Sequence, residues 1–93
     1  MPVVVLVVVP VVEVESELVE TPNPAVLAVV RRHAAGDLVQ LYNVSEEWQR
    51  VPTWVLGTLA GRAVVDRLEG GTPRVEDDHL VLPPYAALWL TAQ

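Results

Sequence analysis

Valine is the residue that most constrains how this chain folds. It supplies 21 of the 93 residues, whereas Ile, Phe, Lys and Cys are absent. The branched Cβ of valine restricts its χ1 angle, which disfavours helices and suits the pleated surface of a sheet. The sequence therefore predicts a mostly β fold.

Short strand-like runs recur along the chain, separated by turns at spacings of about 8–12 residues. With 93 residues, of which 52% are hydrophobic, the chain has the size and the apolar share of one domain. We expect residues 1–93 to form one all-β domain, an antiparallel β-sandwich with Greek-key-like connections. The valine-rich residues 1–12 would provide its first strand.

The charge and the cysteine count exclude several classes of function. Six basic and twelve acidic residues give a net charge of −6. This balance disfavours nucleic acid as a partner, because a phosphate-binding surface needs clustered Lys or Arg. The absence of Cys excludes disulfides, thiolate zinc sites and cysteine nucleophiles. The sequence indicates no cofactor.

The N-terminal valine tract has the pattern of neither a membrane span nor an export signal. Residues 3–12 are too few and contain Pro10, whereas a membrane helix needs about 20 apolar residues. The first positive charge is Arg31, whereas a secretory signal begins with basic residues. We therefore expect no membrane partner and a cytoplasmic location in a bacterium.

A valine tract of this kind would be an aggregation-prone edge if it were exposed. We expect residues 3–9 to be hidden, either as a strand buried within the same chain or as a strand that pairs with a second copy in a homodimer. The low complexity of residues 1–12 leaves a further interpretation open, namely that this segment was engineered.

Several later segments have the pattern of strands. Residues 13–19 alternate, which predicts a strand with its glutamates on a wet face. Residues 25–33 and 38–44 predict a hairpin closed by the turn at 34–37. Further strands are expected over residues 48–56, where Pro52 marks an edge or a bulge, and over residues 62–68, 79–82 and 85–91.

Paired carboxylates are the first enzymatic signal to test, because a retaining glycosidase needs two carboxyl groups about 5–5.5 Å apart. Asp77 and Asp78 are neighbours that would point to opposite faces of a strand. Glu46 and Glu47 lie in a predicted polar turn, where water keeps both ionised. Solvated acidic loops explain both pairs more simply, so the sequence indicates no catalytic residue.

The sequence indicates no metal site either. His33 and His79 are the two imidazoles, and neither has a second ligand at metal-binding spacing. The glutamates of residues 13–17 are explained more simply as a wet strand face than as calcium ligands. A triad of Ser45, His33 and Asp37 would lack a nucleophile elbow and an oxyanion loop.

The five aromatic residues are the remaining candidates for a site. Because the chain has no Phe, these rings are expected mainly to fill the core or an interface with another domain, and Trp89 is expected to be buried. Exposed rings would instead stack on sugars, with Trp48 and Trp54 as the candidates. The complete set is Tyr42, Trp48, Trp54, Tyr85 and Trp89.

Three segments of the chain resemble motifs of a known enzyme family. Residues 23–33 (NPAVLAVVRRH) and 41–49 (LYNVSEEWQ) resemble the hairpin that opens the C-terminal β-domain of α-amylase-family enzymes, glycoside hydrolase family 13. Residues 66–73 (DRLEGGTP) and 80–90 (LVLPPYAALWL) resemble a turn segment and the closing strand of that domain. The amylosucrase type is the most similar, and the valine tract departs from its pattern.

This resemblance implies a role in carbohydrate metabolism, within an enzyme that moves glucose from sucrose onto an α-glucan. In that family the catalytic carboxylates lie in a preceding (β/α)₈ barrel. The resemblance therefore implies a non-catalytic domain whose partner is that barrel, which it covers and stabilises. Two alternatives stay open: a module that binds α-glucan weakly through exposed tryptophans, and an engineered β-domain with no ligand.

Overall fold

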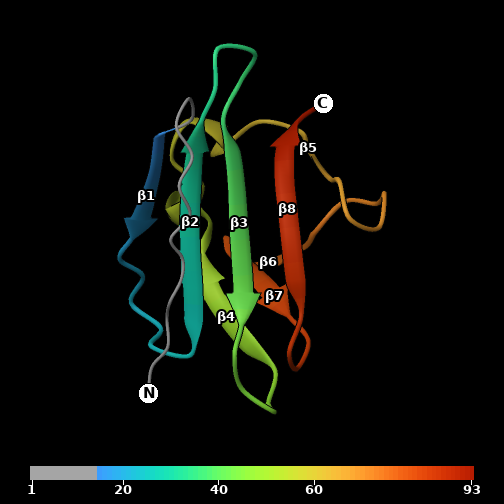
Figure 1. The fold of residues 1–93 in the computed structure, drawn as a ribbon. Coiled ribbons are helices and arrows are strands. Elements are labelled where there is room, and N and C mark those ends of the chain that lie inside the picture. The colour runs from blue at the N-terminus through green and yellow to red at the C-terminus, as the bar shows by residue number, and fades with distance from the viewer. Residues whose placement is uncertain (1–14) are drawn as a thin grey trace.

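Two antiparallel sheets packed face to face make up the fold (Figure 1). The computed structural model describes residues 15–93. One sheet has the strand order β1-β2-β3-β8-β5 and the other has the order β4-β7-β6. The predicted antiparallel sandwich with Greek-key-like connections is confirmed. The elements are β1 (Glu15–Val19), β2 (Val26–Arg32), β3 (Leu38–Asn43), β4 (Gln49–Pro52), the 3₁₀ helix η1 (Thr53–Leu59), β5 (Val64–Asp66), β6 (Arg74–Glu76), β7 (His79–Leu82) and β8 (Ala87–Ala92).

The core between the sheets consists of small and medium aliphatic side chains. On β2 every second residue points inward, and these three are at most 5% exposed. Full burial of one Val or Leu side chain contributes about 1.5–3 kcal/mol. The buried cluster comprises Val26, Ala28, Val30, Val39, Leu41, Val51, Val55, Leu56, Leu59, Val64, Leu80, Leu82 and Leu90.

No aromatic ring belongs to this cluster in the part of the chain that the structure describes. The expectation that aromatic rings fill the core is therefore wrong for residues 15–93, whereas their packing at an interface with another domain stays a prediction. The valines and leucines of two facing sheets fill the space by themselves, which leaves all five rings at the surface or close to it.

The predicted hairpin is confirmed by β2 and β3, whose register pairs Val26 with Asn43 and Arg31 with Leu38. The single strand expected over residues 48–56 is wrong. Strand β4 ends at Pro52, on the edge of its sheet, and η1 follows. Val55 and Leu56 are buried, and they lie in η1 and not in a strand. Periodicity alone does not distinguish a short apolar helical segment from a strand.

Strand β6 was not expected, and it forms a hairpin with β7 that Asp77 and Asp78 close. Both aspartates have positive φ, 49° and 61°, the backbone of a two-residue type I′ turn. The two carboxylates therefore occupy an exposed turn, which agrees with the solvated acidic loop expected for this pair.

Strand β1 presents the face opposite to the one predicted. Its register pairs Glu17 with the buried Val30, so Glu17 and Val19 lie on the inner side, where Val19 packs against the core. Leu18 faces outward and is 67% exposed. An inward glutamate is tolerated because β1 is an edge strand, and Glu17 accepts a hydrogen bond from Arg32 at 3.0 Å near solvent.

The Asn43 side chain connects the two sheets. It is 2% exposed, and its Nδ2 donates to the backbone oxygens of Glu47, Leu82 and Pro83 at 2.7, 3.2 and 2.9 Å. Its Oδ1 accepts from the backbone N–H and the hydroxyl of Ser45 at 2.9 and 2.8 Å. The end of β3 is thereby bound to the end of β7 in the other sheet.

A second asparagine repeats this arrangement next to the start of β2. Asn23 Nδ2 donates to Gln49 Oε1 and to the backbone oxygen of Arg50, both at 2.9 Å. Its Oδ1 accepts from the backbone N–H of Ala25 at 2.9 Å. The segment before β2 is thereby bound to β4, and both contacts lie near the same end of the sandwich.

The valine tract at residues 3–9 lies outside the described residues, so its burial or its pairing with a second copy stays a prediction. The same holds for residues 1–12 as a first strand. Within residues 15–93, no helix has the length and hydrophobicity needed to cross a membrane.

We predict that Asn43→Ala lowers the free energy of unfolding by about 2–4 kcal/mol, because buried backbone groups lose their partner. Chemical denaturation monitored by circular dichroism would measure this. Val44→Ala is the matched control, since Val44 is 60% exposed and an exposed substitution changes stability by about 0.5 kcal/mol or less. Equal effects of the two variants would contradict the connecting role of Asn43.

Candidate functional site

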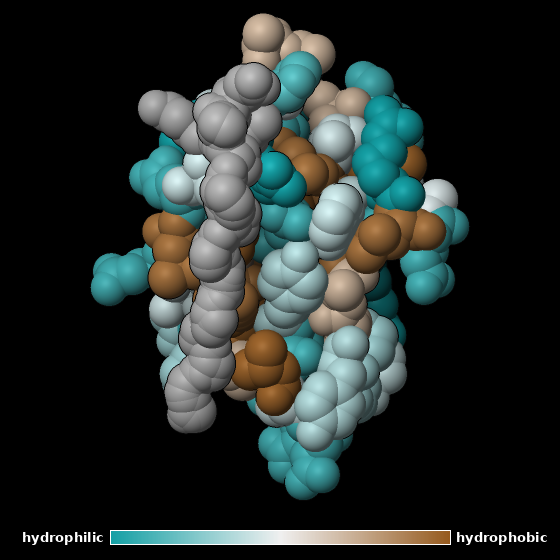
Figure 2. All heavy atoms as spheres, in the orientation of Figure 1, coloured by the Kyte–Doolittle hydropathy of each residue, from teal (hydrophilic) through white to brown (hydrophobic). Residues whose placement is uncertain are grey.

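The outer face of the five-stranded sheet carries apolar and aromatic side chains. Because side chains alternate along a strand, the residues between the inward positions point away from the core. The register places them in three rows across the sheet. Figure 2 looks onto this face, where hydrophobic side chains reach the surface. What we call the outer face consists of Leu18, Val29, Gln40 and Trp89 in one row, Leu27, Tyr42 and Ala87 in the second, and Ser16, Arg31, Leu38, Thr91 and Val65 in the third.

Three of these side chains form a hydrogen-bonded group, which we call the outer triad. Gln40 Nε2 donates to the Tyr42 hydroxyl at 3.0 Å, and Trp89 Nε1 donates to the same oxygen at 3.1 Å. Trp89 lies on the outer face and is only partly buried. Its predicted full burial is therefore wrong. The spacing of Gln40 and Tyr42 indicates a shared face, but the pairing of β3 with β8 that adds Trp89 was not predictable from sequence.

The charges on this face are all positive. Within their bounds the five strands place no carboxylate on the outer side, whereas Arg31 of β2 lies there. Arg67, directly after β5, donates from Nε to the outward Thr91 hydroxyl at 2.8 Å. Neither arginine forms an ion pair with any residue between 15 and 93. This face is therefore cationic on a chain of net charge −6.

The two candidate sugar-stacking residues lie on either side of β4, away from the outer face. Trp48 directly precedes β4 and is 57% exposed, whereas Trp54 is in η1 and is 60% exposed. The Arg74 guanidinium lies over the Trp48 ring, 5.8 Å from its centroid. This contact covers one face of Trp48. Sugar stacking by these rings stays a prediction.

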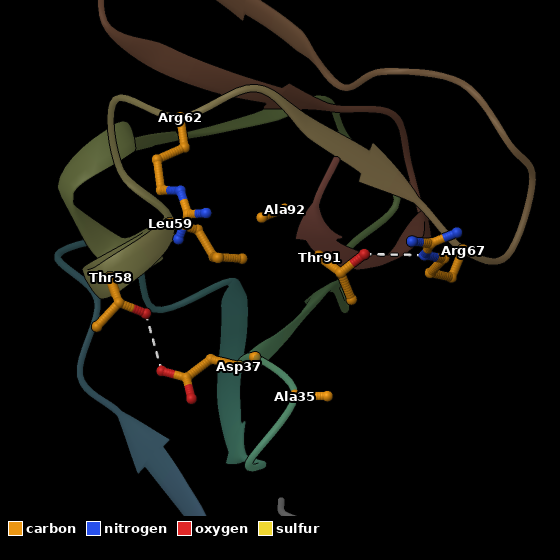
Figure 3. A pocket seen from close by; sticks show the side chains of 9 residues that line it. Ala35, Asp37, Thr58, Leu59, Arg62, Arg67, Thr91 and Ala92 are labelled. Carbon is orange, nitrogen blue, oxygen red and sulfur yellow. Dashed lines mark hydrogen bonds between the residues drawn. The ribbon is translucent and has the colours of Figure 1, made fainter.

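A cavity of about 560 Å³ lies where the β2–β3 turn, η1 and the ends of β5 and β8 meet (Figure 3). Its polar groups come from Asp37, Thr58, Arg62, Arg67 and Thr91. No aromatic ring lines it among the described residues, so it offers a sugar no stacking surface. Asp37 is its single carboxylate in that part of the chain, whereas glycoside hydrolysis requires two.

Asp37 connects the β2–β3 turn to η1. Its Oδ2 accepts from the Thr58 hydroxyl at 2.8 Å and from Arg32 Nη1 at 2.9 Å. These bonds, that of Thr58 first, hold the pKa of the Asp37 carboxyl below its usual value. Arg32 also bonds to Glu17, and the two carboxylates raise the pKa of its guanidinium. These bonds join β1 and the end of β2 to the β2–β3 turn and η1.

The other residues considered for chemistry do not come together. Ser45 follows β3, whereas His33 and Asp37 precede it, so a strand of six residues separates Ser45 from both. The Ser45 hydroxyl is bonded to Asn43. His33 Nδ1 accepts from the backbone N–H of Ala35, and His79 Nδ1 contacts the backbone oxygen of Asp77. No cluster suited to a metal ion occurs in residues 15–93.

We predict that Asp37 gives the fold a pH-dependent stabilisation. Because its folded-state pKa is lowered, the contribution is present above the unfolded value of about 3.9 and is lost as the pH falls through the folded pKa. The melting temperature of the wild type should exceed that of Asp37→Asn at neutral pH, and the difference should shrink below about pH 4. Thermal melts from pH 7 to pH 3 would measure it.

The control for that series is Asp78→Asn, in the exposed β6–β7 turn, where no side chain of residues 15–93 bonds to the carboxylate. The difference in melting temperature between Asp78→Asn and the wild type should not show the pH dependence expected for Asp37→Asn. Identical pH profiles for the two variants would show that the bonds to Thr58 and Arg32 are not the cause.

Comparison with known proteins assigns the described fold to a family. No curated protein matches the chain significantly. Residues 16–91 match the family described as amylosucrase, C-terminal domain. The matched range contains both asparagine contacts, the outer triad and the whole buried cluster, and it leaves the valine tract outside. The chain therefore belongs to the amylosucrase C-terminal domain family.

Proposed function

We propose that this chain is the non-catalytic C-terminal domain of an amylosucrase-type enzyme of glycoside hydrolase family 13, and that it packs against the catalytic (β/α)₈ barrel and stabilises it. The family supports the position of the domain in such an enzyme. The observation that carries the packing role is the outer face, where apolar and aromatic side chains have no protein layer from residues 15–93 above them.

The physical basis of this stabilisation is the burial of exposed apolar surface. Leu18 and Leu27 are 67% and 41% exposed, and covering such side chains removes apolar area from water at about 25 cal/mol per Å². Aromatic side chains with a polar tip, such as Tyr42 and Trp89, are enriched at protein interfaces. The domain then contributes binding energy to the barrel without contributing to the reaction.

We predict that Leu18→Asp lowers the melting temperature of an enzyme that carries this domain, by about 2–4 °C or less for each kcal/mol of stability lost, because a carboxylate would be buried in the interface. Differential scanning calorimetry of the whole enzyme would measure it. Leu68→Asp is the matched control, since Leu68 is 49% exposed in the turn after β5. If both variants melt together with the wild type, the outer face does not contact the barrel.

A second candidate function, weak α-glucan binding, is favoured by the exposure of Trp48 and Trp54. Exposed indole rings present an apolar face to solvent. Among the described residues, no cation lies over the ring of Trp54. In this function the domain would hold polymeric substrate or product close to the enzyme.

We predict for this second candidate that maltoheptaose gives measurable binding heat in a calorimetric titration, and that Trp54→Ala abolishes it because the stacking ring is lost. Tyr85→Ala is the control, since Tyr85 is also an exposed ring, at 68% against 60% for Trp54, but is outside the candidate pair. The same mixture should release no glucose, because the described cavity has a single carboxylate, Asp37, whereas glycoside hydrolysis requires two. Heat unaffected by Trp54→Ala, or no heat at all, would contradict sugar stacking at this residue.

A further inference from the structure

The outer triad has two donors that its internal bonds do not use, the Tyr42 O–H and the second N–H of Gln40 Nε2. The Tyr42 oxygen accepts from both Gln40 and Trp89, and a phenolic oxygen has one proton of its own to donate. No residue between 15 and 93 accepts that proton. The hydroxyl is held in place by two bonds while its proton stays available for an acceptor outside these residues.

This surplus does not depend on which way the Gln40 amide is turned. If its oxygen faced Tyr42, the Tyr42 proton would be used, but the two amide N–H groups of Gln40 would be left over instead. Gln40 is only 6% exposed, so an unused donor there has little access to water. In both orientations the triad keeps at least one donor that has no partner among residues 15–93.

The surroundings of the triad define what a partner must supply. Its neighbours Leu18, Leu27 and Val29 are apolar and lie in the same two rows. The cationic end of the face is separate from the triad. Arg31 is in register with Leu38. Leu38 and Tyr42 are four residues apart on β3, which corresponds to about 13 Å along the strand. A complementary surface is apolar, with an acceptor oxygen at one end and carboxylates at the other.

We propose that Tyr42 is the polar anchor by which this domain docks on its catalytic domain: its hydroxyl donates to an acceptor oxygen of the barrel, and carboxylates of the barrel face Arg31 and Arg67. This inference rests on the proposed function. It adds that the outer face is the docking face and that Tyr42 is the donor of a hydrogen bond to the barrel. Because the chain has a net charge of −6, a partner surface that carries carboxylates is repelled less at this cationic face than by the chain as a whole.

Nuclear magnetic resonance of the indole N–H groups tests which face docks. The chain has three tryptophans, so a ¹⁵N-labelled sample gives three indole signals, assigned by single Trp→Phe variants. An unlabelled amylosucrase barrel lacking its own C-terminal domain, shown to be folded by circular dichroism, is then added. We expect the Trp89 signal to shift and the signals of Trp48 and Trp54 to stay in place.

The outcomes separate this proposal from the proposed function. If no signal changes and ultracentrifugation shows no complex, the proposed function fails. If a complex forms and only Trp48 or Trp54 responds, the function stands and the docking face is overturned. If the Trp89 signal shifts on deletion of residues 1–14 but not on addition of the barrel, the N-terminal segment occupies this face, which also overturns the proposal.

Substitution at Tyr42 tests the bond itself. Tyr42→Phe keeps the ring and removes the hydroxyl, and we expect the affinity for the barrel to fall about tenfold. Tyr85→Phe, on an exposed ring outside the outer face, should change nothing. If Tyr42→Phe does not fold, Arg31→Gln replaces it and should flatten the salt dependence of binding, with Arg74→Gln on β6 as its control. Unchanged affinity and unchanged salt dependence would overturn the anchor.

Discussion

The contact between Asn43 and the backbone of the other sheet is the interaction on which the rest of this structure depends. A two-sheet sandwich of valine and leucine gains its stability from apolar burial, which has no directional preference. The Asn43 amide adds direction, because it bonds to the oxygens of Glu47, Leu82 and Pro83 at fixed positions. The alignment of one sheet on the other follows from these bonds. Removing the amide would leave a core that is still apolar but less well aligned.

The same contact explains why two distant parts of the sequence carry the family resemblance. The segments around Asn43 and around Pro83 are about forty residues apart in the chain, and the amide bonds directly from one to the other. Asn23 acts in a similar way on β4. Hydrogen-bond geometry accounts for these motifs, because each asparagine connects segments that are distant in the chain.

Sequence patterns predicted the parts of the fold that local signals determine. The β2–β3 hairpin has a polar turn between two apolar runs, and the edge position of β4 follows from Pro52. The inverted face of β1 was not predictable, because an edge strand lets Glu17 point inward and still reach water. The helical turn over Val55 and Leu56 was missed because a short apolar run suits either structure.

The candidate site was predictable only in part, for a related reason. Composition suggested that the few aromatic rings would be needed inside, yet the aliphatic residues fill the core without them. The rings were thus left for the surface, and the outer triad arises because β3 and β8 pair in a register that brings Tyr42 and Trp89 together. Strand pairing across 47 residues of sequence has no local signal.

The edges of the three-stranded sheet have a consequence for how such a domain associates. Strand β4 ends in Pro52, and the opposite edge, β6, has three residues, of which Arg74 and Glu76 are charged and joined by an ion pair. Neither edge offers a long row of free backbone donors to another chain. Contacts made by this sheet cannot extend from copy to copy as a continuous ladder. Such a domain can therefore keep a broad apolar face for one partner without that sheet seeding open-ended polymers.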